Sequence, residues 1–286
     1  MMKTAQRLLP LLAGLLPLAL FAQTNPPVAE TNAAADSAAK PPPPLLTDAA
    51  HPAPDAKTLF TIYMIGDSLM STKPLIPAHP ERGWGQMLPQ YFQSGVRIEN
   101  HAINGRSTKS FLDEGRWKIV AASLRTNDWV IIQFGHNDQK DKDTNRFTQP
   151  FGQFQTNLTR FVTETRAHGA SPILCTPVAR RKFDAAGDVV DTHGDYSAAA
   201  RQVAESEKVP LLDLDRRTGQ LLRELGAERA KMLFDWFPTN EFPGLKKNLE
   251  DDTHLNAFGA SRVCDLAVEE IKSAAPELAR HLNPGK

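Results

Sequence analysis

Apolar runs alternate with amphipathic stretches along most of this chain. The strand-like runs cover residues 59–65, 96–101, 128–134, 171–176 and 209–213. The helix-like stretches cover residues 83–93, 115–124, 150–168, 195–206, 215–225 and 257–273. The strand-like runs are nearly continuously apolar, which is typical of central parallel strands covered on both faces, and strands that alternate with helices form βαβ units. The pattern predicts a three-layer α/β/α domain around a parallel sheet of about five strands.

Short polar motifs follow the apolar runs or stand near the C-terminus. They are Gly66-Asp67-Ser68, Asn104-Gly105, Gly135-His136-Asn137-Asp138 and Asp251-Asp252-Thr253-His254. In an open α/β sheet, ligands bind beyond the carboxyl ends of the strands, so we expect the motifs to converge in space. Together they supply a hydroxyl nucleophile, neutral hydrogen-bond donors and a carboxylate close to a histidine. Those groups are what acyl transfer needs.

Ser68 is the candidate nucleophile because it directly follows the first strand-like run. A serine at a strand-to-helix turn is also a common helix N-cap, and that alternative stays open for the serine taken alone. If a helix starts here, its dipole would favour the negative charge that develops on an attacked ester. The surrounding residues do not match the G-x-S-x-G turn of the α/β-hydrolases.

His254 is the candidate general base, and Asp251 is the carboxylate expected to orient it. If residues 251–254 form one helical turn, both side chains lie on one face, and Asp252 lies on another. Asn256 is the expected cap of the final helix, whose positive end would help to keep His254 neutral. The alternative is an ordinary surface turn.

Gly105 and Asn137 are the candidate oxyanion donors, through a main-chain N–H and a side-chain amide. Ser68 would supply a further main-chain N–H. Turns are the commonest use of both residue types, so each residue alone is a weak signal. Their place after successive strands favours an oxyanion hole.

Composition excludes several classes of protein. The chain has 286 residues, with 33 Lys+Arg against 33 Asp+Glu, so no excess of charge points to nucleic acid. The sequence contains no H-E-x-x-H or C-x-x-C pair and no phosphate-binding glycine loop. We therefore expect no metal site, no cofactor and no nucleic-acid partner. Cys175 and Cys264 are interpreted as buried free thiols, with a disulfide as the open alternative.

The N-terminus predicts export. Residues 1–22 have a basic start, an apolar stretch and small residues before Gln23, which is typical of a cleaved signal peptide. Residues 23–57 are rich in Pro and Ala and predict a disordered linker. The folded domain then spans residues 58–286. We expect a secreted or periplasmic protein with no membrane attachment after signal cleavage.

The motifs taken together resemble those of the SGNH (GDSL) hydrolase superfamily, over residues 62–260. The resemblance implies a flavodoxin-like α/β/α fold and a serine ester hydrolase. It implies that Ser68 is nucleophile and first oxyanion donor, with Gly105 and Asn137 as further donors. It also implies that His254 is the base and Asp251 its acid.

A narrower set of residues is similar to the rhamnogalacturonan acetylesterases of carbohydrate esterase family 12. These residues are 133–138, 176–181, 191–196, 252–256 and 259–260. The narrower likeness implies removal of acetyl groups from a plant cell-wall polysaccharide, with rhamnogalacturonan or pectin first. Another SGNH ester hydrolase (acetylxylan esterase, lipase or thioesterase) is an open alternative, as is a non-catalytic carbohydrate-binding protein. Residues 236–249 are expected to form a loop that shapes the pocket.

Overall fold

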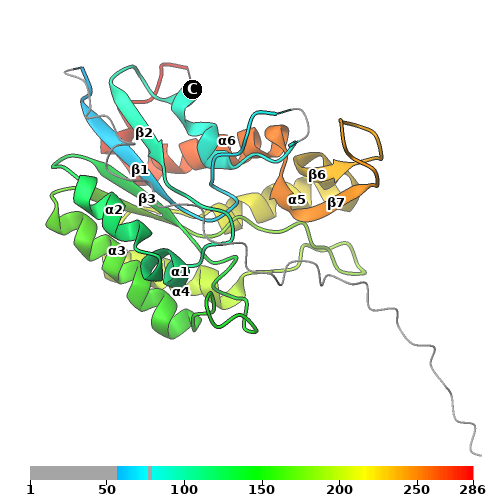
Figure 1. Ribbon diagram of the computed structural model, residues 1–286, viewed down its shortest axis with the longest axis horizontal. Coiled ribbons are helices and arrows are strands. Elements are labelled where there is room, and N and C mark those ends of the chain that lie inside the picture. Colours follow the sequence, from blue (N-terminus) through cyan, green and yellow to red (C-terminus); the bar gives the residue numbers. More distant parts are fainter. Residues whose placement is uncertain (1–56, 77–78, 286) are drawn as a thin grey trace, which may run out of the picture. The chain divides into compact units, whose positions relative to one another are not determined.

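A parallel five-stranded sheet organises the part of the chain that the computed structural model describes, which is residues 57–76 and 79–285. The strands are β1 (Phe60–Gly66), β2 (Val96–Asn100), β3 (Trp129–Gln133), β4 (Ser171–Cys175) and β5 (Leu211–Leu212). Their order is β2-β1-β3-β4-β5, all parallel (Figure 1). This is the flavodoxin-like order. The predicted sheet is confirmed, whereas the signal peptide and all but the last residue of the linker lie outside the described residues.

Helices cover both faces of the sheet (Figure 1). One layer contains α1 (Thr108–Asp113), α2 (Arg116–Ser123), α3 (Gln155–Ala167) and α4 (Gly194–Ser206). The other contains α5 (Leu214–Ala230), α6 (Ala257–Ala274) and the short α7 (Pro276–Ala279). The three-layer architecture is therefore confirmed. No helix within the described residues is long and apolar enough to cross a membrane.

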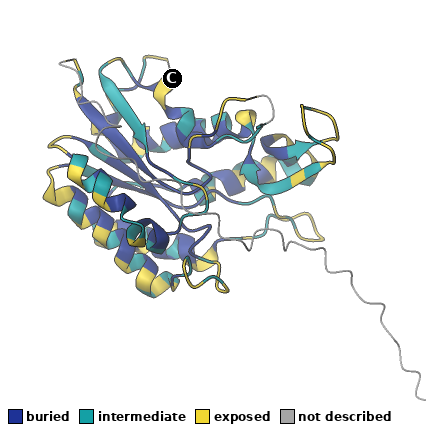
Figure 2. Ribbon diagram, viewed as in Figure 1, coloured by how far each residue is buried: buried dark blue, intermediate teal, exposed yellow. Residues whose placement is uncertain are grey.

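Alternate side chains of the central strands enter two separate cores. On β1, Ile62 and Met64 pack into the core under α5 and α6, whereas Tyr63 and Ile65 pack into the core under α1–α4. Successive side chains of a strand point to opposite faces, so a strand between two helical layers must be apolar at every position. Figure 2 shows this burial through the sheet. Burying each such side chain stabilises the fold by roughly 1.5–3 kcal/mol.

The predicted helix at residues 83–93 is wrong. The segment forms two short 3₁₀ turns, η2 (Trp84–Gln86) and η3 (Leu88–Tyr91). A Cβ at Gly83 would lie 2.1 Å from the carbonyl oxygen of Ser71, so this chain segment packs directly on the backbone that follows β1. Pro89 also lacks the N–H that a continuing helix would need.

A two-stranded antiparallel hairpin was not predicted. It consists of β6 (Phe234–Phe237) and β7 (Leu249–Leu255), with an irregular register between Phe234 and Trp236. Residues 236–249 were expected to form a loop, but both ends of that range belong to these strands. The hairpin matters because β7 carries the Asp251–His254 motif.

Cys175 and Cys264 are free and buried, as interpreted from the sequence. Cys175 ends β4 and Cys264 lies on α6. Burial raises the pKa of both thiols, so neither is a ready nucleophile.

Removing residues 1–57 is expected to leave a soluble, active domain. The described fold begins just before β1, where the main-chain N–H of Leu59 donates to the carbonyl oxygen of Gly95 at 2.8 Å. The Pro/Ala-rich sequence before it lacks the apolar periodicity of a packed element. Thermal unfolding and ester hydrolysis of the truncated and full-length proteins test this; an insoluble or inactive product would show that the linker belongs to the domain.

Candidate active site

Ser68, His254 and Asp251 form one continuous chain of hydrogen bonds. The Oγ of Ser68 lies 3.0 Å from Nε2 of His254, and Nδ1 of His254 lies 2.8 Å from Oδ2 of Asp251. The Nδ1–H donates to the carboxylate, which leaves Nε2 free to accept the proton of the serine hydroxyl. Residues separated by almost the whole domain in sequence therefore meet at the carboxyl end of β1.

The Asp251–His254 pair does not lie on a helical turn. Both residues belong to strand β7, and the pair meets because the chain folds back on the Asp251 carboxylate. Its Oδ1 accepts hydrogen bonds from the main-chain N–H groups of Thr253 (2.7 Å) and His254 (2.9 Å). The expected pairing is correct and the expected geometry is wrong. The aspartate that orients the ring also fixes the backbone that carries the ring.

The segment that carries Ser68 is a single turn (residues 68–70), not the start of a helix. Asp67 stabilises this turn, since its Oδ1 accepts from the main-chain N–H of Leu69 at 3.0 Å. The expected helix, and with it the expected helix dipole at Ser68, is therefore wrong. A single turn held by the Asp67 carboxylate takes its place. Within the described residues, no group accepts a hydrogen bond from the main-chain N–H of Ser68, so this donor is available to a ligand.

Asp252 points away from the site, as expected. Its Oδ1 lies 2.5 Å from Nη1 of Arg181 and accepts a 2.8 Å hydrogen bond from the indole N–H of Trp236. The Arg181 guanidinium also stacks over the Trp236 ring, 4.9 Å from its centroid. Asp252 thus ties the β6–β7 hairpin to the loop after β4.

The pKa of His254 shifts in the opposite direction to the one expected from the final helix. Asn256 caps α6, with its Oδ1 accepting from the N–H of Gly259 at 3.0 Å, so the expected cap is confirmed. Burial lowers the pKa of His254, but the hydrogen bond with Asp251 and the charges of Glu81 and Asp251 outweigh it, and the pKa is raised overall. The Asp251 hydrogen bond and the two carboxylate charges therefore set the direction of the shift.

Gly105 and Asn137 lie on neighbouring loops beyond β2 and β3. Asn137 donates one amide hydrogen to the carbonyl oxygen of Arg106 at 3.1 Å, which joins the two loops and leaves its second amide hydrogen for a ligand. Gly105 has a φ of +75°, a conformation that favours glycine. In the described structure its main-chain N–H has no acceptor. Both donors are therefore available to a ligand, and their role in an oxyanion hole stays a prediction.

Asp138 holds the Asn137 loop against the start of α1 and the segment before α3. Its Oδ1 accepts from the main-chain N–H of Thr108 (3.0 Å), which starts α1, and from the hydroxyl of Thr148 (2.9 Å). Burial raises the pKa of this carboxyl to about 7, although the hydrogen bonds oppose the rise. Asp138 belongs to the quoted Gly135–Asp138 motif, but no role was predicted for it from the sequence.

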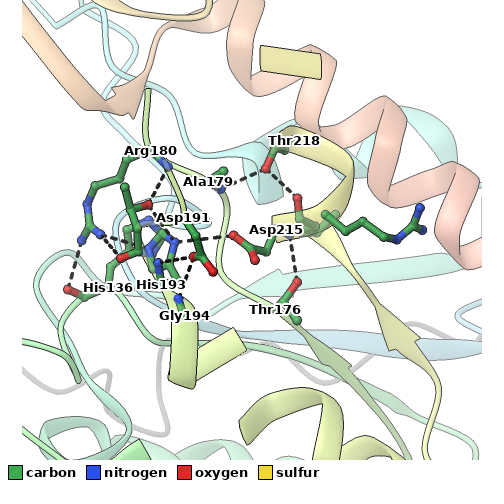
Figure 3. A network of polar contacts seen from close by, with 12 residues as sticks. His136, Thr176, Ala179, Arg180, Asp191, His193, Gly194, Asp215 and Thr218 are labelled. Atoms are coloured by element: carbon green, nitrogen blue, oxygen red, sulfur yellow. Dashed lines mark hydrogen bonds and ion pairs between the residues drawn. The ribbon is translucent and has the colours of Figure 1, made fainter. Parts of the chain in front are cut away.

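A buried polar network adjoins the same loop (Figure 3). Arg180 donates to the carbonyl oxygen of His136 at 3.4 Å and lies 3.1 Å from Nε2 of His193. The two histidine rings are 4.4 Å apart between centroids. Burial lowers the pKa of His136 to about 3, so this ring is neutral. Three of the segments quoted for the narrower likeness therefore converge next to Asn137.

No group of three or more His, Cys, Asp or Glu side chains in the described part of the chain could hold a metal ion. The expectation of a metal-independent site stays a prediction. It is tested by measuring ester hydrolysis before and after dialysis against a chelator.

Comparison with known proteins places the chain in a family. Residues 64–262 match the GDSL-like lipase/acylhydrolase family, and the chain belongs to it. It is therefore a carboxylic ester hydrolase.

Within this family, two relatives are similar in sequence and one solved structure is similar in fold. The chain is 41% identical over 221 residues to the rhamnogalacturonan acetylesterase RhgT of Bacillus subtilis (strain 168), covering 77% of this chain and 93% of that protein. It is 26% identical over 230 residues to the rhamnogalacturonan acetylesterase of Emericella nidulans, covering 74% and 84%. The acetylxylan esterase Axe2 of Geobacillus stearothermophilus shares the fold, with a TM-score of 0.55 at 18% identity over 75% of this chain and 94% of that one.

Proposed function

We propose that this protein is a secreted or periplasmic serine esterase that removes acetyl groups from a plant cell-wall polysaccharide, with rhamnogalacturonan as its substrate. The hydrogen-bonded chain from Ser68 through His254 to Asp251 carries the proposal. The identity to RhgT supports the choice of polysaccharide. Export rests on the sequence pattern of residues 1–22.

The proposed reaction starts at Ser68. Its Oγ attacks the acetyl carbonyl carbon while Nε2 of His254 takes the hydroxyl proton, and Asp251 stabilises the imidazolium that forms. The carbonyl oxygen becomes an oxyanion, held by the N–H groups of Ser68 and Gly105 and the amide of Asn137. His254 then returns the proton to the departing sugar oxygen, which leaves an acetyl-serine. Water, deprotonated by His254, releases acetate and restores Ser68.

A groove at the junction of β7 and α6 supports a polymeric substrate. A groove of about 560 Å³ is lined by Asn256, two residues after His254, and by Phe237, Phe258 and Arg82. Phe258 is 50% exposed there. An open groove with an exposed aromatic side chain supports a saccharide chain that extends past the ester.

Acetate release from acetylated rhamnogalacturonan, xylan and homogalacturonan, measured side by side, tests the proposal. Rhamnogalacturonan is expected to be deacetylated fastest, and Ser68→Ala supplies the blank. Faster release from xylan would reassign the substrate. A preference for p-nitrophenyl octanoate over acetate would point to a lipase or thioesterase instead. Pectin binding without hydrolysis of any ester would point to a binding protein.

Asn137→Ala is expected to lower kcat by about 10²- to 10³-fold, because it removes one of the three proposed oxyanion donors. The matched control is Asn145→Ala, an exposed asparagine in the loop that follows, which should leave kcat unchanged. Steady-state hydrolysis of p-nitrophenyl acetate measures both variants. Equal activity of the two would remove Asn137 from the oxyanion hole.

Activity is expected to fall on the acidic side as His254 becomes protonated and can no longer accept the serine proton. Since its pKa is raised, this limb should lie above the ordinary imidazole value of about 6.5. The pH dependence of kcat/KM reports the free enzyme and is the measurement to make. A limb below the ordinary value would contradict the electrostatics assigned to the site.

A further inference from the structure

A buried ion pair lies beside the triad and takes no part in the proposed reaction. The side chain of Lys73 is only 1% exposed, and its Nζ lies 2.5 Å from Oε1 of Glu81, whose side chain is 18% exposed. Lys73 belongs to the extended segment after the Ser68 turn, and Glu81 lies eight residues further along. Burying an ammonium group costs free energy unless the group is paired, so the fold must keep Lys73 within contact of Glu81.

The lysine end of the pair holds the loop that carries a proposed oxyanion donor. The Nζ of Lys73 donates to the side-chain oxygen of Asn104, which also accepts a 2.6 Å hydrogen bond from the hydroxyl of Ser71. Asn104 directly precedes Gly105. The main chain of Lys73 is itself fixed by Gln86, through hydrogen bonds of 3.0 and 3.1 Å.

The glutamate end approaches the histidine. Glu81 forms an antiparallel bridge with Asn256, and the next N–H, that of Arg82, donates to the carbonyl oxygen of Leu255 at 2.8 Å. The segment therefore runs beside the end of β7, directly after His254. The charges of Glu81 and Lys73 act on that ring in opposite directions.

We propose that the Lys73–Glu81 ion pair couples the Asn104–Gly105 turn to His254, with Lys73 as a positioning residue for the Gly105 N–H. The inference rests on the catalytic roles proposed for Gly105 and His254. It deepens them, because the oxyanion hole and the base would then share one buried support. Two variants separate the ends of the pair: Lys73→Met keeps the length of the side chain, and Glu81→Gln keeps its shape.

The groups that face the His254 ring set the expected signs. They are Asp251, Glu81, Lys73 and Asp235. Glu81→Gln removes an anion, so the pKa of His254 should fall. Lys73→Met removes a cation, so the pKa should rise, and the double variant should lie between the two. Burial raises the pKa of Asp235 to about 7. Each titration is therefore repeated with Asp235→Asn, which removes the overlapping proton.

The ring titration is measured by NMR on histidine-labelled full-length protein, with the His254 signal assigned by its loss in His254→Asn. Kinetics on p-nitrophenyl acetate run in parallel. Lys73→Met should lower kcat about tenfold to 100-fold with KM changed less than about threefold, because a displaced donor weakens transition-state binding alone. Lys109→Met is the control, since Lys109 pairs with Asp113 on the exposed side of α1. It should change neither readout.

Shifts of the His254 pKa in the same direction in both variants, or no shift in either, would overturn the coupling. So would a loss of kcat in Lys73→Met matched by an equal loss of folded protein. If Lys73→Met does not fold, the direction of the shift in Glu81→Gln decides. The titration needs no turnover, so opposite shifts in a protein that hydrolyses no ester would refute the proposed function and leave the ion pair standing. If the protein hydrolyses esters but neither variant shifts the pKa of His254, the coupling is refuted and the proposed function stands.

Discussion

Ser68→Ala is expected to reduce ester hydrolysis by about 10⁵- to 10⁶-fold while the protein stays folded. The hydroxyl is the group that forms the bond to the acetyl carbon, and its Oγ lies 3.0 Å from the nitrogen that accepts its proton. What remains would be the contribution of the oxyanion donors and of substrate binding. Purified variant, assayed on p-nitrophenyl acetate beside circular dichroism and thermal unfolding, gives the result.

The control for Ser68→Ala is Ser123→Ala. Ser123 lies on α2, and its hydroxyl donates a 3.1 Å hydrogen bond to the carbonyl oxygen of Ile119 within the same helix. It should retain wild-type kcat. Retention of most activity by Ser68→Ala would end the assignment of the nucleophile, whatever the stability of the variant.

Asp251→Asn is expected to lower kcat by up to about 10⁴-fold with little change in KM. The carboxylate accepts the Nδ1–H of His254, and an amide in its place would favour the wrong tautomer of the ring. Although burial works in the opposite direction, the hydrogen bonds from His254 and Thr253 hold the pKa of Asp251 below its ordinary value. The carboxylate is thus ionised where the reaction needs it. The loss belongs to the transition state, so binding is spared.

Asp252→Asn is the matched control for Asp251→Asn. Its side chain contacts Arg181 and Trp236, so the change should lower stability modestly and kcat little. Steady-state kinetics and thermal unfolding of both variants show which of the two aspartates orients His254. If Asp252→Asn is the inactive one, the pairing assigned to His254 is wrong.

The parallel sheet could be predicted because burial on both faces leaves a strong signal. Ile62 and Ile65 serve different cores, yet each must be apolar, and the run that results is easy to recognise. The 83–93 segment could not be predicted in the same way. Its conformation depends on contact between Gly83 and the backbone of Ser71, which no local pattern encodes.

The α1 helix and the β6–β7 hairpin were missed for a related reason. α1 is six residues long, too short for a helical period, and its capping box uses Ser107 and Ser110 rather than the usual acidic partner. β7 is polar at every position from Glu250 to His254, and the pairing of the two strands is irregular in register, so the alternation of apolar and polar residues is weak.

Within the site, the sequence predicted which side chains meet but not how. Ser68, His254 and Asp251 were identified from their motifs, yet the turn types around them were wrong. Lys73 and Glu81 gave no sequence signal, because a lysine and a glutamate eight residues apart read as solvated charges. Only the burial of the lysine distinguishes them, and burial depends on the whole fold.

Asp251 and His254 both lie on β7, whose strand partner is β6, whereas Ser68, Gly105 and Asn137 follow strands of the parallel sheet. The bond between Nδ1 and Oδ2 therefore lies within one strand, whereas the bond from Nε2 to the serine hydroxyl joins the hairpin to the parallel sheet. The tautomer of the ring is thus set by a local contact, and its distance to the nucleophile is set by the packing of two separate sheets.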